Sequence, residues 1–494
     1  MRTVAPTAIF VYFWIMVMCS TSCQPPDETA ATPNIVFILA DDLGWADLPA
    51  YGNQFHETPN IDKLVAEGMR FTNAYAACPV CSPTRASIQS GQYPARLGII
   101  DFITGHWRPH ERLTVPKNKT QFLPLEIETI GEVLKQANYS TGYFGKWHLG
   151  NEPYFPEHQG YDESVIFHGS PYYKFSKRLK PPQDFPDDKI LSEALTDLSI
   201  DFINKHHEKP FFLTLAHYDV HVQLDADSGL IEKYLEKPRV ENHPCNAVYA
   251  AMVEHIDNSV GRIMETLSTL GLSDNTLVVF FSDNGGLVSR FDEVPLIAES
   301  KRHFYAGDSL MLHVASSNAP LRAEKGTVYE GGIREPMIVK WPGVVPAGST
   351  SDALISSIDL LPTFREIAGV TDPIDQVVDG ESFLATLSEG EYDPDRSLFW
   401  HYPVYHHDVP ASVIRKGDWK LIHKLDNDEL FLYDLSRDVG EQHNLAESEV
   451  AIRDALKSQL DQWRTEVAAE MPVPNAQFDA AKRKEWGTHP DRQK

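Results

Sequence analysis

Two short acidic motifs follow apolar segments of the chain. Asp41-Asp42 and Asp283-Asn284 each stand at the end of an apolar run rich in β-branched residues. In an open α/β sheet the carboxyl ends of parallel strands lie at one edge, and sites form there. Carboxylates brought together at that edge repel each other unless a cation lies between them, and oxygen ligands without Cys or His favour Ca²⁺ or Mg²⁺. Each aspartate could instead cap a helix, but the recurrence at two strand ends favours a metal site.

Cys81 is a third feature that could carry chemistry. It opens the segment Cys81-Ser-Pro-Thr-Arg85, for which a turn that holds a free thiol is the alternative. The chain has five cysteines, two of them within residues 1–23, so an odd number remains in the body of the protein. In an exported protein an odd count indicates a thiol that is unpaired, reactive or chemically altered. Cys78 and Cys81 form a CxxC, but no second CxxC accompanies it, so a redox or zinc motif is not favoured.

A basic pair follows another predicted strand. In Gly145-Lys146-Trp147-His148 the lysine and the histidine are two residues apart. Residues two apart in a strand share a face, so both side chains would point into one site. Solvated lysine and histidine are common, so this pair indicates a functional site only in combination with the other motifs.

The composition excludes one class of partner. The 494 residues include 70 Asp and Glu against 44 Lys and Arg, which gives a formal net charge of −26. Nucleic-acid binding calls for a basic face, so we expect no nucleic acid as a partner. An anionic substrate would need a local basic pocket in this acidic protein. Hydrophobic residues at 42% and charged residues at 23% are typical of a globular protein with a substantial core.

The N-terminus has the features of an export signal. Arg2 precedes the apolar run Ala8–Met18, which is much shorter than the roughly 20 residues of a membrane-spanning helix. Small residues then precede Cys23, as at a bacterial lipoprotein cleavage site, although Ser20 stands where Leu is usual. We therefore expect residues 1–23 to be a secretory signal, with acylation of Cys23 and simple cleavage as the two alternatives.

Apolar strands alternate with helical segments along the first part of the chain. This alternation predicts an α/β fold with a doubly wound sheet. The expected strands and helices are strands at 34–40, 139–144, 210–216 and 275–281, and helices at 59–68, 129–137 and 247–267.

The chain changes character after about residue 390. Short runs punctuated by Gly and Asp predict antiparallel strands, at 411–415, 419–422 and 430–433, before a closing helix at 450–467. The predicted organisation therefore begins with a signal at 1–23 and a linker at 24–33. A catalytic domain at 34–390, a C-terminal α+β subdomain at 391–475 and a polar tail at 476–494 follow.

Five motifs, in order, resemble those of the type I sulfatases of the alkaline phosphatase superfamily, in particular the arylsulfatase A and N-acetylgalactosamine-6-sulfatase types. They are the strand that ends in Asp41-Asp42 and the segments 81–91, 139–148, 282–286 and 322–334. The match runs from about residue 33 to 440. Two departures, Gln89-Ser90 for Leu-Thr and Asn138 for Gly, fall at positions that do no chemistry.

The resemblance implies an alkaline-phosphatase-like large mixed sheet sandwiched by helices, with a smaller C-terminal subdomain of antiparallel sheet plus helix. It implies a sulfuric ester hydrolase in which a maturation enzyme converts Cys81 to formylglycine, whose hydrate is the nucleophile. One Ca²⁺ per chain would be held by Asp41, Asp42, Asp283, Asn284 and the modified Cys81. A phosphomonoesterase or phosphodiesterase of the same superfamily, and an unmatured glycan-binding relative, are the alternatives.

The family pattern also implies roles for the basic residues. Arg85 and Lys146 would lower the pKa of the diol by their positive charge. His148 would act as the base when sulfate is expelled, and His221 would act as the general acid for the departing alcohol. Lys325 would contact the sulfate and the leaving oxygen.

Four further residues are candidates for binding the substrate: His217, Arg322, His401 and His406. For His217 a structural hydrogen bond is the alternative. The segment 396–408 concentrates aromatic and histidine side chains that can stack on sugar rings or bind hydroxyls, although Phe399 is expected to be a core residue of a strand. The expected substrate is a sulfated polysaccharide or oligosaccharide, attacked by an exo-acting enzyme.

The resemblance and the signal together imply partners and a location. The expected partners are the sulfated glycan, the formylglycine-generating maturation enzyme and the export machinery. The membrane would be contacted only through a lipid on Cys23. The expected location is the periplasm or the cell surface of a bacterium that degrades sulfated polysaccharide.

Overall fold

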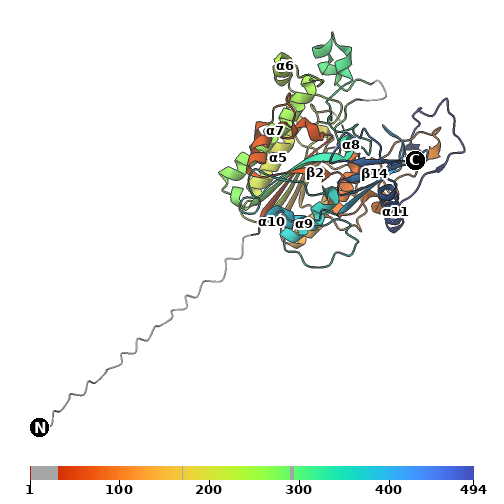
Figure 1. Ribbon diagram of the computed structural model, residues 1–494. Coiled ribbons are helices and arrows are strands. Elements are labelled where there is room, and N and C mark those ends of the chain that lie inside the picture. The colour runs from red at the N-terminus through yellow and green to blue at the C-terminus, as the bar shows by residue number, and fades with distance from the viewer. Residues whose placement is uncertain (2–31, 168, 170, 290–293, 494) are drawn as a thin grey trace. The chain divides into compact units, whose positions relative to one another are not determined.

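The computed structural model describes Met1 and residues 32–167, 169, 171–289 and 294–493. From Pro33 onward the chain forms one compact unit (Figure 1). The predicted signal at 1–23, with Cys23, lies outside the described residues, as does almost all of the predicted linker. In the part of the chain that is described, no helix has both the length and the apolar character needed to cross a membrane.

A ten-stranded mixed sheet forms the centre of this unit, which confirms the predicted fold class. Its strands are β1 Asn34–Ala40, β2 Met69–Tyr75, β4 Ser140–Lys146, β5 Glu163–Phe167, β6 Leu179–Lys180, β7 Phe211–Ala216, β8 Thr276–Ser282, β9 Arg334–Lys340, β10 Ser349–Ser351 and β11 Ile355–Ser356. Their order is β10-β2-β9-β8-β1-β7-β4-β5-β6, with β11 paired to β2. Strands β8, β1, β7, β4 and β5 are parallel, whereas β9 is antiparallel to both β8 and β2.

Helices cover both faces of the sheet (Figure 1). On one face lie α1 Pro59–Glu67, α5 Leu191–His206 and α7 Ala247–Thr269, and on the other lie α2 Cys81–Ser90, α4 Ile130–Gln136 and α9 Leu360–Ile367. Every residue of β1 is buried, and its successive side chains point to opposite faces. Val36 and Ile38 join the core under α5 and α7, whereas Ile35 and Phe37 join the core under α2, α4 and α9. The continuous apolar run thus forms a strand that is covered on both sides.

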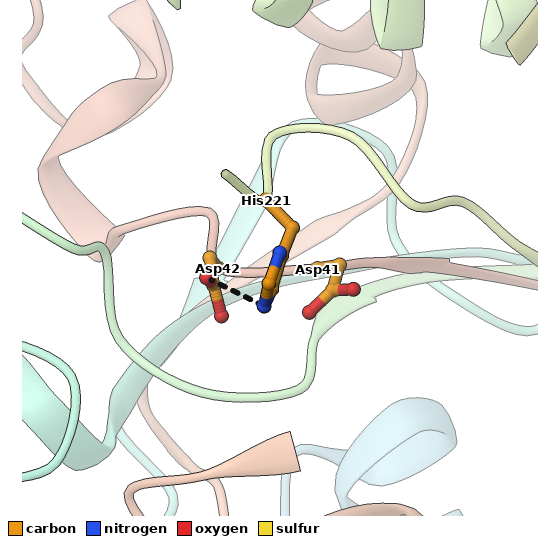
Figure 2. A group of neighbouring side chains, drawn as sticks. All are labelled: Asp41, Asp42 and His221. Carbon is orange, nitrogen blue, oxygen red and sulfur yellow. Dashed lines mark ion pairs between the residues drawn. The ribbon is translucent and has the colours of Figure 1, made fainter. Parts of the chain in front are cut away.

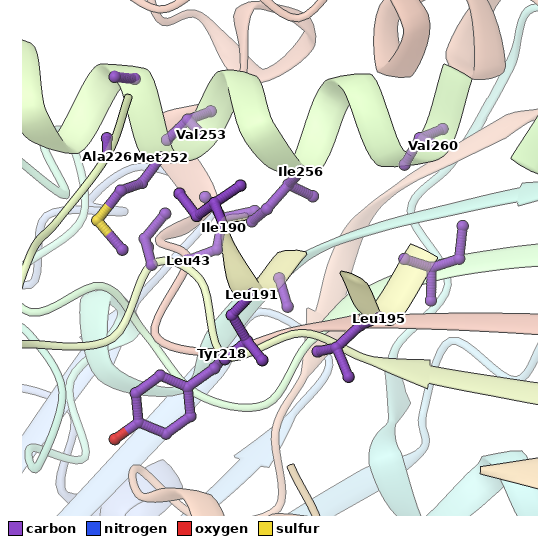
Figure 3. Packing of buried hydrophobic residues seen from close by; sticks show 14 of the residues in the cluster. Leu43, Ile190, Leu191, Leu195, Tyr218, Ala226, Met252, Val253, Ile256 and Val260 are labelled. Carbon is purple, nitrogen blue, oxygen red and sulfur yellow. The ribbon is translucent and has the colours of Figure 1, made fainter. Parts of the chain in front are cut away.

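Helix α7 fills one of these two cores. Asn246 caps it, because its side chain accepts hydrogen bonds from the amides at positions 248 and 249. Figure 3 shows apolar side chains of α7, among them Ile256 and Val260, in the same buried cluster as Leu191 and Leu195 of α5. The 3.6-residue periodicity predicted for 247–267 therefore corresponds to a helix face that packs on the sheet layer.

A four-stranded antiparallel sheet follows, as expected for the C-terminal region. Its strands, in sheet order, are β12 Ser397–Tyr402, β13 Ala411–Lys416, β14 Trp419–Lys424 and β15 Glu429–Asp434, and α11 Val450–Glu466 packs against it. Phe399 of β12 stacks on Trp463 of α11 with ring centroids 4.9 Å apart. This is the core position expected for Phe399.

A buried charge network joins the two sheets. Lys420 of β14 lies 2.8 Å from a carboxylate oxygen of Glu330, which precedes β9, and 2.8 Å from one of Glu441, which follows β15. Tyr75 of β2 donates a hydrogen bond to Glu330 at 2.6 Å. All three charged side chains are inaccessible to solvent. Lys420 thus bridges two buried carboxylates at the junction between the sheets, and Arg334 and Arg415 lie 3.4 and 3.8 Å from Glu330.

We predict that Lys420→Met lowers the free energy of unfolding by about 3–5 kcal/mol, because it removes the ammonium that pairs with the buried carboxylate of Glu441. Chemical denaturation followed by circular dichroism measures this change. Lys416→Met, at a partly exposed position of the neighbouring strand, is the matched control and should change stability by about 0.5 kcal/mol or less. Equal effects of the two substitutions would contradict a stabilising role of the network.

Candidate active site

The segments that follow four neighbouring strands emerge at one edge of the large sheet. In the sheet register, Ala40 of β1 pairs with Ser282 of β8, and Leu39 pairs with Ala216 of β7. Gly145 of β4 also pairs with Ala216. The residues that come next in the chain are therefore brought together, and they include Asp41, Asp42, Lys146, His148, His221, Asp283 and Asn284.

Asp41 and Asp283 share two buried cations. Arg85 donates from Nε to Asp283 Oδ2 at 2.8 Å, and its terminal nitrogen lies 3.8 Å from Asp41 Oδ2. Lys146 Nζ donates to Asp41 Oδ2. Burial and the neighbouring Asp41 raise the pKa of Asp283 to about 6. Burial alone would lower the pKa of Lys146, but the carboxylate of Asp41 outweighs it and raises that pKa.

Asp42 is held by a third cation. Lys325 Nζ donates to its two carboxylate oxygens at 2.6 and 2.8 Å, and Asn284 Nδ2 donates to Oδ1 at 2.8 Å. Burial would raise the pKa of Asp42, but the positive charges of Lys325 and Lys146 outweigh burial and lower it. Asp42 also has a φ of 61°, in the left-handed region that non-glycine residues seldom adopt and that recurs at functional sites.

Two buried oxygens at this cluster indicate room for a cation. Asp41 Oδ1 and Asn284 Oδ1 are buried and have no hydrogen-bond partner among the described residues, a costly arrangement unless another group binds them. Ligand atoms of Asp41, Asp42 and His221 also lie within 4.8 Å of one another. Figure 2 shows the His221 ring reaching from its loop toward the two aspartates. The donor set of carboxylate and amide oxygens fits a hard divalent ion.

Cys81 lies at the first turn of α2, so the turn considered for it in the sequence is instead a helix start. Its side chain is buried, and Sγ lies 3.2 Å from His148 Nδ1. Burial raises the pKa of the Cys81 thiol, although Lys146 and Lys325 act to lower it. The positive end of the α2 dipole also faces this position and favours negative charge there.

His148 lies beyond the end of β4, so the expectation that it shares a strand face with Lys146 is wrong. Its φ of 58° is left-handed, and Gly145, with a φ of 123°, has no room for a Cβ because one would lie 1.8 Å from the carbonyl oxygen of Ala216. This turn, rather than strand alternation, brings both side chains into the site. His148 Nε2 lies 2.9 Å from the Ile103 carbonyl oxygen, to which it donates, so Nδ1 is the nitrogen that can accept a proton from position 81.

His221 faces the carboxylates from the loop after β7. Its Nδ1 donates to the Val222 carbonyl at 2.6 Å, and Nε2 lies 3.7 Å from Asp42 Oδ2. Burial lowers the pKa of His221 to about 3, although Asp42 acts in the opposite direction. The imidazole is therefore neutral in the substrate-free protein, with its unprotonated nitrogen directed at the cluster.

A cavity of about 360 Å³ opens above these groups. Six residues predicted from the sequence line it, namely Cys81, Lys146, His148, His221, Lys325 and His406. Basic side chains thus concentrate in a cavity of an acidic protein, as an anionic substrate requires.

Three predicted substrate-binding residues lie elsewhere. His217 is buried and its Nε2 bonds to Ser259 Oγ at 2.9 Å, which matches the structural alternative. Arg322 donates to the Glu441 carbonyl at 2.5 Å, and His401 bonds through its two ring nitrogens to Ser412 Oγ and to the Glu470 carbonyl. One terminal nitrogen of Arg322 thus binds the C-terminal region, and both ring nitrogens of His401 are used within that region. Neither residue is among those that line the cavity.

Several lining residues were not predicted from the sequence: Phe102, Ile103, His106, Tyr218, Leu287 and His407. Phe102 and His106 belong to the run Asp101-Phe-Ile-Thr-Gly-His-Trp107, which mixes aromatic and histidine side chains in the same way as 396–408. That density of aromatic and histidine residues could have indicated that this loop lines the cavity.

The chain is similar to known proteins over most of its length. A sulfatase of Formosa agariphila is 31% identical over 86% of this chain and 86% of its own length. The N-acetylgalactosamine-6-sulfatase of Rattus norvegicus is 36% identical over 75% of this chain and 68% of its own length. A solved structure, i-CgsB in complex with k-i-k-neocarrahexaose, superposes with a TM-score of 0.73 and 28% identity over 91% of this chain and 96% of that chain.

Family models cover most of the described chain. The model described as Sulfatase matches residues 33–370, and the one described as N-sulphoglucosamine sulphohydrolase, C-terminal, matches residues 323–466. The first match spans the strands of the large sheet, the cluster of carboxylates and cations, and the cavity-lining residues other than His406 and His407. With these matches, the chain belongs to the sulfatase family and is a sulfuric ester hydrolase.

Proposed function

We propose that this enzyme removes sulfate from a sulfated polysaccharide or oligosaccharide, with formylglycine derived from Cys81 as nucleophile and one bound Ca²⁺. The observation that carries the proposal is the position of Cys81, which lines the cavity with Sγ 3.2 Å from His148 Nδ1. The glycan is supported by relatives, one named for N-acetylgalactosamine 6-sulfate and one solved with a neocarrahexaose.

The modified residue and the ion have separate tasks. Formylglycine would supply a geminal diol, whose second hydroxyl allows sulfate to leave where a cysteine or serine would keep it. The ion would be held by Asp41, Asp42, Asp283 and Asn284 and would supply positive charge beside the sulfate oxygens. Ca²⁺ is the proposed ion because these ligands are hard oxygen donors.

The residues around position 81 favour an anion there and can take up its proton. Lys146 and Lys325 both act to lower the pKa of a group at this position, and the N-terminus of α2 adds its dipole. His148 keeps one ring nitrogen on the Ile103 carbonyl and presents the other to position 81. We assign His148 as the base that accepts the proton when sulfate is expelled.

His221 is assigned as the general acid for the departing alcohol. The Val222 carbonyl occupies Nδ1, so a transferable proton would be on Nε2, the nitrogen that faces Asp42. A pKa of about 3 is too low for this role. A bound sulfate ester adds negative charge beside the ring, and a nearby negative charge raises the pKa of histidine. Protonation of His221 is thus coupled to substrate binding.

The alternative of a phosphomonoesterase or phosphodiesterase with two zinc ions is less well supported. Among the described residues, a second group with the geometry for a metal is Glu152, Glu157 and His158, and it is exposed and separate from the residues that line the cavity. Lys146 and Lys325 take the places beside the carboxylates that a second ion would need. Cationic side chains there suit the oxygens of a sulfate ester.

The cavity volume favours action on a terminal sugar. About 360 Å³ is near the lower limit of small-molecule sites, which is room for one sulfated sugar rather than for a long internal stretch of chain. His406 lines this cavity and is proposed to bind the sugar. Maturation by a formylglycine-generating enzyme, export to the periplasm or cell surface, and the choice between lipidation of Cys23 and simple cleavage are part of the same proposal.

We predict that Cys81→Ala and Cys81→Ser each reduce multiple-turnover sulfate release by at least about a thousandfold, the scale on which removal of a nucleophile acts. The serine variant should stop because its sulfate ester is stable. Release of sulfate from a small aryl sulfate and from N-acetylgalactosamine 6-sulfate measures the loss, and mass spectrometry of the wild-type peptide tests for the aldehyde. Thermal midpoints within about 2 °C of wild type would show intact folds. Repeated turnover by either variant would sink the covalent mechanism.

A second prediction concerns the ion. Chelation should remove most of the activity, and Ca²⁺ should restore it better than Mg²⁺, because the site offers several fixed carboxylate ligands. Elemental analysis should find one calcium per wild-type chain and none in the Asp41→Asn, Asp283→Asn double variant. Glu152→Gln, in the exposed acidic group, is the control and should keep its calcium. Two zinc ions per chain would overturn the assignment in favour of the phosphatase alternative.

A further inference from the structure

Three aromatic rings form a row from the wall of the cavity to the protein surface. We call His406, His106 and Trp486 the ring row. The His406 and His106 rings have centroids 3.8 Å apart, and those of His106 and Trp486 are 5.4 Å apart. His406 and His106 line the cavity, whereas 36% of Trp486 is exposed. The row therefore continues the cavity wall outward past the cavity itself.

Arg108 contacts both Trp486, at the surface end of the ring row, and His406, at the cavity end. Its guanidinium lies 4.1 Å from the centre of the Trp486 ring, and one terminal nitrogen donates to the His406 carbonyl at 2.9 Å. Asp101 fixes the middle ring, because its carboxylate lies 3.0 Å from His106 Nδ1. Charged partners thus hold the His106 and Trp486 rings, and the Tyr402 hydroxyl lies 3.3 Å from His406 Nδ1.

The C-terminal segment 473–492 delivers Trp486 to this place. It packs on the loop that carries His106: Asn475 Nδ2 donates to the carbonyl of Glu111 at 2.8 Å, Arg483 Nε donates to the Glu111 carboxylate at 3.0 Å, and the amide of Gly487 donates to the Trp107 carbonyl at 2.9 Å. Because the neighbouring residues are held by these bonds, Trp486 is positioned before any ligand arrives. Such preorganisation reduces the entropic cost of binding.

Trp486 lies where a second sugar would emerge. The cavity has room for about one sulfated sugar, so the next ring of an oligosaccharide must lie at the mouth. The exposed 36% of Trp486 offers apolar surface there beside the Arg108 guanidinium, and imidazole nitrogens next to it can bind hydroxyls. We propose that Trp486 is a specificity-determining residue that binds the sugar ring next to the sulfated one. This inference depends on the proposed glycan sulfatase function.

The test compares Trp486→Ala, Trp486→Phe and wild type on three probes: a small aryl sulfate, N-acetylgalactosamine 6-sulfate, and a sulfated oligosaccharide with that sugar at its end. For Trp486→Ala we expect kcat/KM on the oligosaccharide to fall about two- to tenfold further than on the other two probes, the scale of one lost aromatic contact. The loss should lie in KM, and Trp486→Phe should recover most of it. Phe478→Ala, an exposed aromatic of the same segment, is the matched control and should match wild type on all probes.

Calorimetric binding of the desulfated oligosaccharide gives a readout that needs no turnover, and Trp486→Ala should weaken it by the same factor. Equal losses on all three probes would overturn the proposal, because Trp486 would then only support the catalytic centre. Unchanged kinetics and binding would overturn it as well. If wild type releases no sulfate from any probe yet binds the oligosaccharide through Trp486, the proposed function fails while the sugar-binding role of Trp486 stands.

Discussion

The structure depends on a charge balance buried at the ends of parallel strands. Three carboxylates, of Asp41, Asp42 and Asp283, lie against three cations in a region that helices on both sides of the sheet keep dry. In a medium of low dielectric constant these attractions are strong, and an unpaired member would be very costly. The parallel strands bring the charges together, and the helices on both faces exclude water and so strengthen the interactions. The ion pairs that the fold needs are therefore formed by the same residues that are proposed to act in catalysis.

Several strands and helices around this cluster could be predicted from the sequence, because the residues of each one show its hydrophobic pattern. Strand β1 is one continuous apolar run, and Asp41 follows it directly, so strand and ligand were identified together. Strands β2 and β9 were not predicted, because they include polar residues and, in β9, a proline. They form strands because β9 pairs with β8 and β2 pairs with β9, and these pairings between distant segments cannot be seen in the local sequence.

The substrate-binding residues were harder to predict for the same reason. A cluster of aromatic and histidine residues at 396–408 indicated a role, but in β12 alternate residues face opposite sides, so density alone could not separate His401 from His406. His401 binds Ser412 and the Glu470 carbonyl, whereas His406 lies beyond the strand and reaches the cavity. The C-terminal segment packs on the loop at 104–121, although more than two-thirds of the chain separates them in sequence. Its polar composition gave no indication of this contact.

The burial of Cys81 has a consequence for the timing of synthesis. The strands that close the site over this thiol come late, since Asp283 follows Cys81 by roughly 200 residues. At a synthesis rate of about 5–20 residues per second, the nascent chain carries Cys81 for about 10–40 s before Asp283 exists. During that interval Arg85 lacks Asp283, the carboxylate to which it donates in the folded protein. An enzyme that alters the thiol must work within this interval or on a chain that has not yet folded, because the finished protein leaves the side chain almost no exposed surface.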